Sequence, residues 1–195
     1  MIVILVLGSL IYAAYSFGKQ TKSITKPEAI KTENIDLEVI SSPISSPPSL
    51  VTVVGGLPKS AGLSFDQYSI TTPDEWISKR ESQTTTDEKL ILEKDGYSIS
   101  IFQAATGGAL CLYPGDADFE GPSSRFLKFV ELTTKDNKNL RRSGEGTAFT
   151  ICQKSADGSY LQPTNYGHIS VKLPANPTPE MLTEIDSIIS SLKKL

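Results

Sequence analysis

Three carboxylates stand at alternate positions in the segment PGDADFEGP, as Asp116, Asp118 and Glu120. Alternating oxygen ligands suit a hard cation such as calcium, and Gly121 occupies the sixth position, where a calcium loop turns sharply. The twelfth position of an EF-hand loop carries a bidentate carboxylate, but here it is Leu127. We therefore favour a solvated acidic turn, assign no metal ligands, and keep calcium as the alternative.

His168 is the single imidazole of the chain, so a catalytic triad or a Cys–His pair would have to use it. The glycine before it fits the start of a strand, and no G-x-S-x-G, C-x-x-C, H-E-x-x-H or glycine-rich phosphate loop occurs. One His and two Cys also fall short of most multi-ligand zinc sites. We expect no enzyme activity, no catalytic residue and no cofactor.

Arg141 and Arg142 are adjacent, and adjacent residues of a strand point to opposite faces of a sheet. They should therefore not form one clamp for an anion. The net charge of the chain is −3, so it has no basic excess to neutralise phosphates. Nucleic acid is not an expected partner.

Cys111 and Cys152 are the two cysteines, an even count downstream of an apolar N-terminal segment that indicates export or membrane insertion. We predict that they form a disulfide, which would stabilise the fold by roughly 3–4 kcal/mol in the chain-entropy model. The alternative is two free buried thiols that pack as small apolar side chains.

That apolar segment is 1–18, MIVILVLGSLIYAAYSFG, which has no charged side chain. Its length fits a membrane span of about 20 apolar residues, so we predict an uncleaved transmembrane anchor. A signal peptide cut after Ser16 is the alternative, because Ala14 and Ser16 would provide the small residues at its cleavage site. A buried core helix is disfavoured because the run has no polar face.

The orientation of this anchor has arguments on both sides. Four lysines follow the span, which by the positive-inside rule would place the rest of the chain in the cytoplasm. The cysteine pair favours an oxidising compartment instead, and an upstream start carrying basic residues would reconcile the two. We expect a single-pass protein of the cell membrane with an extracytoplasmic C-terminal domain.

Residues 19–62 are predicted to be a flexible linker, because SSPISSPPS at 41–49 favours extended conformations. Within it, 50–54 is a short β-like run ended by two glycines. The folded domain is expected over 63–195.

A β-hairpin over 89–103 is the best-defined element of that domain, because Asp95-Gly96 favours a type I′ turn. The turn sets the register, which should place Lys94 opposite Tyr97, Leu92 opposite Ile99, and Leu90 opposite Ile101. Other strands are expected at 68–72, 125–134, 149–152 and 168–173, with a polar loop at 78–88 and a long loop at 104–124.

The last predicted element is a helix that begins after Thr178 as the N-cap, with Pro179 in the first turn. An apolar stripe continues to Leu195, and Lys193 and Lys194 are expected in the final turn. Such a stripe is typical of a helix that packs on a sheet.

Several of these features resemble a known family. The segment YSITTPDEW, with Pro73 and Trp76, the DG hairpin, the further strands and the final IDSIISSLKKL resemble the PsbP-like fold of photosystem II extrinsic proteins and of many bacterial membrane-anchored proteins. The resemblance covers 63–195 and implies an α+β fold, an α/β/α sandwich with an antiparallel sheet and a C-terminal helix. The cysteine-containing loop departs from the photosystem members, and fold analogy does not carry function.

Two functions follow as expectations. The first is a monomeric, membrane-tethered extracytoplasmic domain that binds or supports an envelope component without catalysis. The alternative is a module that binds a small ligand or calcium through the 104–124 loop.

Overall fold

The computed structural model describes residues 48–58 and 62–195. The predicted anchor, residues 1–18, and most of the predicted linker lie outside the described residues. Within the described part, no helix is long and apolar enough to cross a membrane.

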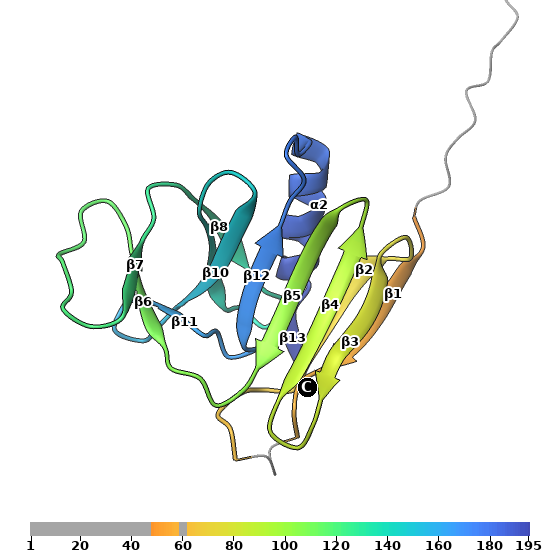
Figure 1. Cartoon of the computed structure of the whole chain (residues 1–195), viewed down its shortest axis with the longest axis horizontal. Helices are drawn as coiled ribbons and strands as arrows, with labels where there is room; N and C mark the ends of the chain where they lie inside the picture. The colour runs from red at the N-terminus through yellow and green to blue at the C-terminus, as the bar shows by residue number, and fades with distance from the viewer. Residues whose placement is uncertain (1–47, 59–61) are drawn as a thin grey trace, which may run out of the picture. The chain divides into compact units, whose positions relative to one another are not determined.

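The chain has an α+β fold, with a mostly antiparallel sheet and one C-terminal helix among the described residues (Figure 1). The strands are β1 (Leu50–Gly55), β2 (Tyr68–Pro73), β3 (Ile77–Gln83), β4 (Glu88–Lys94), β5 (Tyr97–Gln103), β6 (Ala109–Leu112), β7 (Ser123–Arg125), β8 (Phe129–Thr133), β9 (Asn139–Ser143), β10 (Ala148–Lys154), β11 (Tyr160–Gln162), β12 (His168–Lys172) and β13 (Lys193–Lys194). The helix is α2 (Pro179–Ser190).

The large sheet branches at β10. Strands β3, β4, β5, β12 and β10 follow one another, and β9 and β8 continue from β10 as one branch. The other branch is β11, β6 and β7, which we call the flap together with its loops. All these pairings are antiparallel except β6 with β7. A small separate sheet consists of β1, β2 and β13.

The predicted hairpin is confirmed as β4 and β5. Asp95 and Gly96 both have positive φ, 49° and 81°, as a type I′ turn requires. The cross-strand pairs are the predicted ones: Lys94–Tyr97, Leu92–Ile99 and Leu90–Ile101.

The predicted helix is confirmed as α2, and Thr178 caps it by accepting a hydrogen bond from the Met181 N–H at 3.3 Å. Its buried residues are Ile185, Ile188 and Ile189. The prediction was wrong at the C-terminal end, since the helix stops at Ser190 and the two lysines form β13 against β2. Pairing with β2 supplies the backbone partners that a further helical turn would have supplied.

Three loop or strand predictions need correction. The polar loop 78–88 is largely β3, an edge strand of the large sheet whose side chains are almost all exposed, so it lacks an apolar alternation. The long loop 104–124 contains β6 and begins β7. The strand 125–134 is divided between β7 and β8.

The predicted linker boundary is also corrected. The β-like run at 50–54 is β1, which pairs with β2 over its whole length. After β1, the N–H of Gly56 donates to Glu88 Oε1 at 3.1 Å and that of Leu57 donates to Gln103 Oε1 at 2.8 Å. The folded part therefore includes residues 50–57 as well.

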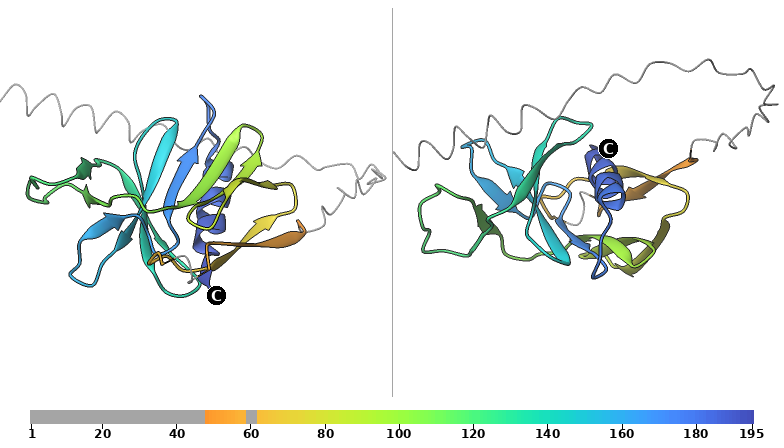
Figure 2. Two further views of the ribbon diagram at one scale, coloured as in Figure 1. Left: turned by 60° about the horizontal axis from the view of Figure 1, so that its bottom comes forward. Right: turned by 90° about the horizontal axis from the view of Figure 1, so that it is seen from above.

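Two cores lie on opposite faces of the sheet. The main core lies between the sheet and α2, and the views of Figure 2 show the helix on one side of the strands. In β10, Ile151 belongs to the main core, whereas Cys152 belongs to the second core, as alternation along a strand requires. The second core contains Cys111, Tyr113, Cys152 and Tyr160, with Phe126 against it. The flap thus covers the far face of the sheet only at its β8–β9–β10 end.

Candidate functional site

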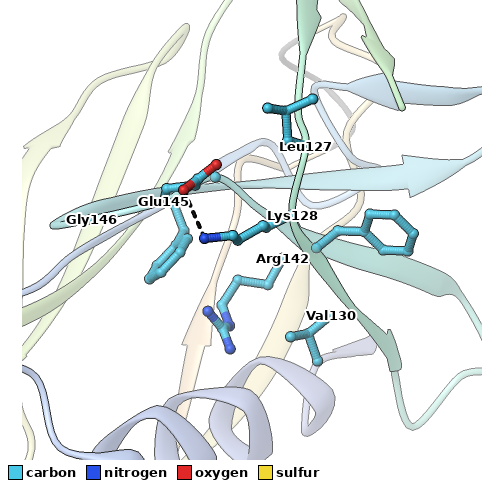
Figure 3. Close-up of a pocket in the computed structure, with 9 residues that line it drawn as sticks. Leu127, Lys128, Val130, Arg142, Glu145 and Gly146 are labelled. Atoms are coloured by element: carbon cyan, nitrogen blue, oxygen red, sulfur yellow. Dashed lines mark hydrogen bonds and ion pairs between the residues drawn. The ribbon is translucent and has the colours of Figure 1, made fainter. Parts of the chain in front are cut away.

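An open groove of about 600 Å³ lies on the α2 side of the sheet, where β8 and the β9–β10 turn meet (Figure 3). Its apolar walls are Leu127, Val130 and Phe149. Phe129 also borders the groove, but its ring points to the opposite face of the sheet, where it packs against Tyr113. Two cations, Lys128 and Arg142, and one carboxylate, Glu145, complete its polar lining.

The β9–β10 turn shapes one end of the groove. Gly144 has a φ of 128°, and a Cβ there would lie 2.9 Å from the carbonyl oxygen of Ala148. A side chain at this position would therefore meet backbone and adopt a strained conformation. The Gly144 N–H donates to the Lys128 carbonyl at 3.1 Å, which holds the turn against the start of β8.

Arg142 forms the floor of the groove. Its Nε donates to Asp186 Oδ1 at 2.6 Å and its Nη2 donates to Asp186 Oδ2 at 3.1 Å, a bidentate pair between β9 and α2. The guanidinium carbon also lies 4.5 Å from the centre of the Phe149 ring. Its side chain is only 8% exposed, so this cation is committed to the fold.

The rim of the groove combines a paired charge with exposed apolar side chains. Lys128 Nζ lies 2.9 Å from Glu145 Oε2, the pair joined by a dashed line in Figure 3. Leu127 is 71% exposed and Val130 is 41% exposed. Both cations of the groove therefore have a carboxylate partner, and exposed apolar side chains lie beside them.

One edge of β8 is open along this groove. Among the described residues, β8 pairs with β9 alone. Because the Lys128 carbonyl faces β9, alternation directs the N–H and C=O groups of Phe129, Glu131 and Thr133 away from β9. An open edge beside apolar pockets is the arrangement that accepts an added strand.

The polar side chains that line the groove are all charged. None of its nine lining residues is a His, Cys, Ser, Thr or Tyr. Arg142 is held in a buried pair with Asp186, whereas Lys128 and Glu145 pair with each other at the exposed rim.

The predicted disulfide is present. Cys111 of β6 and Cys152 of β10 are bonded, with their Cα atoms 6.4 Å apart. The bond lies in the second core and ties the flap to the sheet. It is a structural site, away from the groove.

The three predicted carboxylates do not converge. Asp116 Oδ2 accepts from the Tyr113 N–H at 2.7 Å, as in a local turn, and Asp118 is 99% exposed and pairs with Arg125 at 2.7 Å. Across 48–58 and 62–195, no group of three or more His, Cys, Asp or Glu side chains is arranged to hold a metal ion. Glu120 is exposed beside them.

The two arginines diverge as predicted. Arg141 faces the second core, where its guanidinium carbon lies 3.9 to 4.2 Å from the ring centres of Tyr113, Phe129 and Tyr160. Its Nη2 also lies 2.7 Å from Glu131 Oε1. Arg141 is therefore a cation enclosed by the protein's own aromatic rings.

His168 lies on the face opposite α2 and lines a different hollow from the groove. Its Nε2 lies 2.6 Å from Thr106 Oγ1, and burial holds the pKa of the imidazole below its ordinary value.

Sequence patterns did not identify the groove. The apolar pair Phe129-Val130 and the glycines after β9 are the signals that could have indicated it.

Comparison of the chain with protein-family models, with curated proteins and with solved structures finds no match.

Proposed function

We propose that this chain is a membrane-tethered, extracytoplasmic and non-enzymatic binding module that holds an extended segment of an envelope protein along β8. The observation that carries the proposal is the open edge of β8 beside a groove whose charges are already paired. An added strand would gain main-chain hydrogen bonds from the edge and place alternate side chains against Val130 and Phe149.

The compartment is proposed from two features. A structural disulfide persists in an oxidising environment, so the Cys111–Cys152 bond supports a location outside the cytoplasm. The uncharged sequence of 1–18 supports attachment to a membrane. Together they support a binding domain that faces the cell envelope.

The PsbP-like relationship is kept as a proposal about the fold. An antiparallel sheet that ends in a C-terminal helix supports it. In the described residues, the flap rather than a helix covers part of the second face, which is a departure from an α/β/α sandwich.

A small-ligand role for the 104–124 loop is the second candidate. A hollow of about 550 Å³ lies between this loop and the β10–β11 turn, with Asp116, Arg141 and Tyr160 in its lining. If calcium binds there, it should raise the melting temperature by mass action, and chelation should reverse the shift.

The β8 proposal is tested with the full-length chain in lipid nanodiscs and a displayed library of linear peptides. Thr133→Pro removes an outward N–H without removing a ladder hydrogen bond, so it should abolish binding of selected peptides while the fold persists. Thr133→Ala keeps the N–H and is the matched control. Peptides should shift the NMR signals of Phe129, Glu131 and Thr133.

A second pair of variants tests the groove. Val130→Asp should weaken the same peptides at least tenfold, since it places a carboxylate against the apolar wall. Val51→Asp is the control, because Val51 of β1 is similarly exposed, at 45%. A library that yields no binders, or binders unaffected by Thr133→Pro and Val130→Asp, would overturn the proposal.

A further inference from the structure

The face opposite α2 is open over β4, β5 and β12, where the flap does not reach (Figure 1). The antiparallel pairing of β5 with β12 sets three rows of side chains across this face. The rows are Phe102 opposite His168, Ser100 opposite Ser170, and Ser98 opposite Lys172. All six side chains line one hollow of about 580 Å³.

The middle of this face carries uncommitted hydroxyl groups. Ser98, Ser100 and Ser170 are half-buried, and within the described ranges their hydroxyls make no hydrogen bond to the protein. No buried side-chain polar atom there lacks a partner, so solvent reaches these hydroxyls. They can exchange water for the hydroxyls of a ligand.

One end of the array is aromatic. Phe102 and His168 lie side by side, and Thr106 holds the imidazole through the 2.6 Å contact at Nε2. The Phe102 ring and this imidazole offer a platform of two flat rings beside the polar hydroxyls. The C–H face of a sugar ring can stack on such a platform while its hydroxyls face the serines.

The other end carries Lys172, whose charge acts on Glu81 across the hollow without forming an ion pair in the described residues. Lys79 pairs with Glu93 at 3.0 Å and Lys89 pairs with Glu81 at 2.6 Å. In the described part of the chain, Lys172 has no carboxylate within ion-pair distance. The charge left over for a ligand is therefore positive and lies at this end.

We propose that this face binds a short segment of an acidic glycan. A sugar ring stacks on Phe102 and His168, further hydroxyls exchange hydrogen bonds with Ser100 and Ser170, and a carboxylate reaches Lys172. The three rows span two steps of about 7 Å along the strand, which suits a short oligosaccharide.

A peptide strand is the less suitable occupant of this face. Both β5 and β12 are paired on their two sides, so they offer no free backbone edge to a peptide. The site is separate from the β8 groove, and its proposal does not depend on that of the groove. A domain with both sites could hold a wall polymer and an envelope protein at once.

The test uses the full-length chain in lipid nanodiscs and three acidic probes at millimolar concentration: trigalacturonate, a hyaluronan tetrasaccharide and the N-acetylglucosaminyl–N-acetylmuramic acid disaccharide. At least one should shift the amide NMR signals of Ser100 and Ser170. Its methyl ester, which lacks the carboxylate charge, should bind about tenfold more weakly. Lys172→Gln should make acid and ester bind equally.

Phe102→Ala should weaken the bound probe at least tenfold, whereas Phe119→Ala, which removes another exposed aromatic ring outside this face, should leave it unchanged. Thr133→Pro should also leave glycan binding intact, which separates this test from that of the groove. The proposal is overturned if no acidic probe shifts these amides, if acid and ester bind the native chain equally, if Phe119→Ala has the effect of Phe102→Ala, or if library peptides shift this face.

Discussion

At the scale of single residues, Arg142 determines how the sheet and helix meet beside the groove. It joins β9 to α2 through Asp186 and packs on Phe149, which also lines the groove. A charge with this little solvent contact depends on its partner, because an unpaired ion in such surroundings is costly. The Arg142–Asp186 pair therefore fixes the floor of the groove.

Asp186→Ala is expected to destabilise the fold by about 3 kcal/mol, at the lower end of the range for a broken buried pair, because Asp186 keeps 20% of its side chain exposed. Replacing both partners, Arg142→Met with Asp186→Leu, should recover most of the loss, since no charge is then left alone. Urea unfolding measures both. An Asp186→Ala variant within 0.5 kcal/mol of the parent, roughly the effect of an ordinary surface substitution, would show that the pair is not structural.

His168 should make stability depend on pH. Burial lowers the pKa of the folded imidazole below its ordinary value of 6.5. Just below pH 6.5 the unfolded chain therefore binds more protons than the folded chain, and stability falls as pH falls, until the folded imidazole is protonated as well. His168→Gln should reduce the change of the free energy of unfolding with pH in that window. A one-histidine NMR titration gives the pKa directly, and a value above 6.5 would contradict this prediction.

At the scale of elements, the strands and the helix that have their own turn, cap or apolar alternation were predictable from the sequence. Features that arise from contacts between separate elements were not. The β4–β5 hairpin was predictable to the residue pair because turn and alternation agree, and α2 because cap and apolar stripe agree. Strand β3 lacks a buried face, so nothing in its composition distinguished it from a loop. The groove forms where β8 contacts the β9–β10 turn, and no local sequence pattern predicts that contact.

Ile185→Asp should abolish folding. Ile185 is fully buried at the centre of the face that α2 packs on the sheet. Burying an unpaired carboxylate there would consume much of a stability margin of about 5–15 kcal/mol. Circular dichroism should show a loss of cooperative melting, whereas Thr183→Asp on the exposed side of α2 should melt cooperatively. A folded Ile185→Asp protein would mean that α2 does not depend on this contact.

At the scale of the whole molecule, β1 changes where the folded part begins. It pairs with β2, and the residues after it donate to Glu88 and Gln103, two buried polar side chains. The sequence suggested a flexible linker over this range because serine and proline dominate the residues just before it.

Two shortened chains should separate tether from fold. A chain that starts at residue 48 should melt at the same temperature as the full-length chain. A chain that starts at residue 59 should melt several degrees lower, because it loses β1 and leaves Glu88 and Gln103 without their backbone donors. Differential scanning calorimetry compares them. Equal melting temperatures for the two shortened chains would mean that β1 does not contribute to the stability of the fold.

The disulfide joins the flap to β10 across a sequence separation of 41 residues. Removing it with Cys111→Ala and Cys152→Ala should lower the free energy of unfolding by roughly 3–4 kcal/mol in the chain-entropy model. The loss of hydrogen-exchange protection should be greatest in the flap, because the second core holds little besides this bond and a few aromatic rings. A uniform loss over the β4–β5 hairpin as well would mean that flap and sheet unfold as one unit.

The same bond tests the proposed compartment. A cytoplasmic domain would keep both thiols reduced, whereas an extracytoplasmic one should carry the bond in every molecule. Mass spectrometry under non-reducing conditions, on full-length protein taken from its native membrane after alkylation of free thiols, distinguishes the two. We expect neither Cys111 nor Cys152 to be alkylated until a reductant is added. Two alkylated thiols would remove the main support for an external domain and leave the lysines after the proposed span, residues 1–18, as the stronger guide to its orientation.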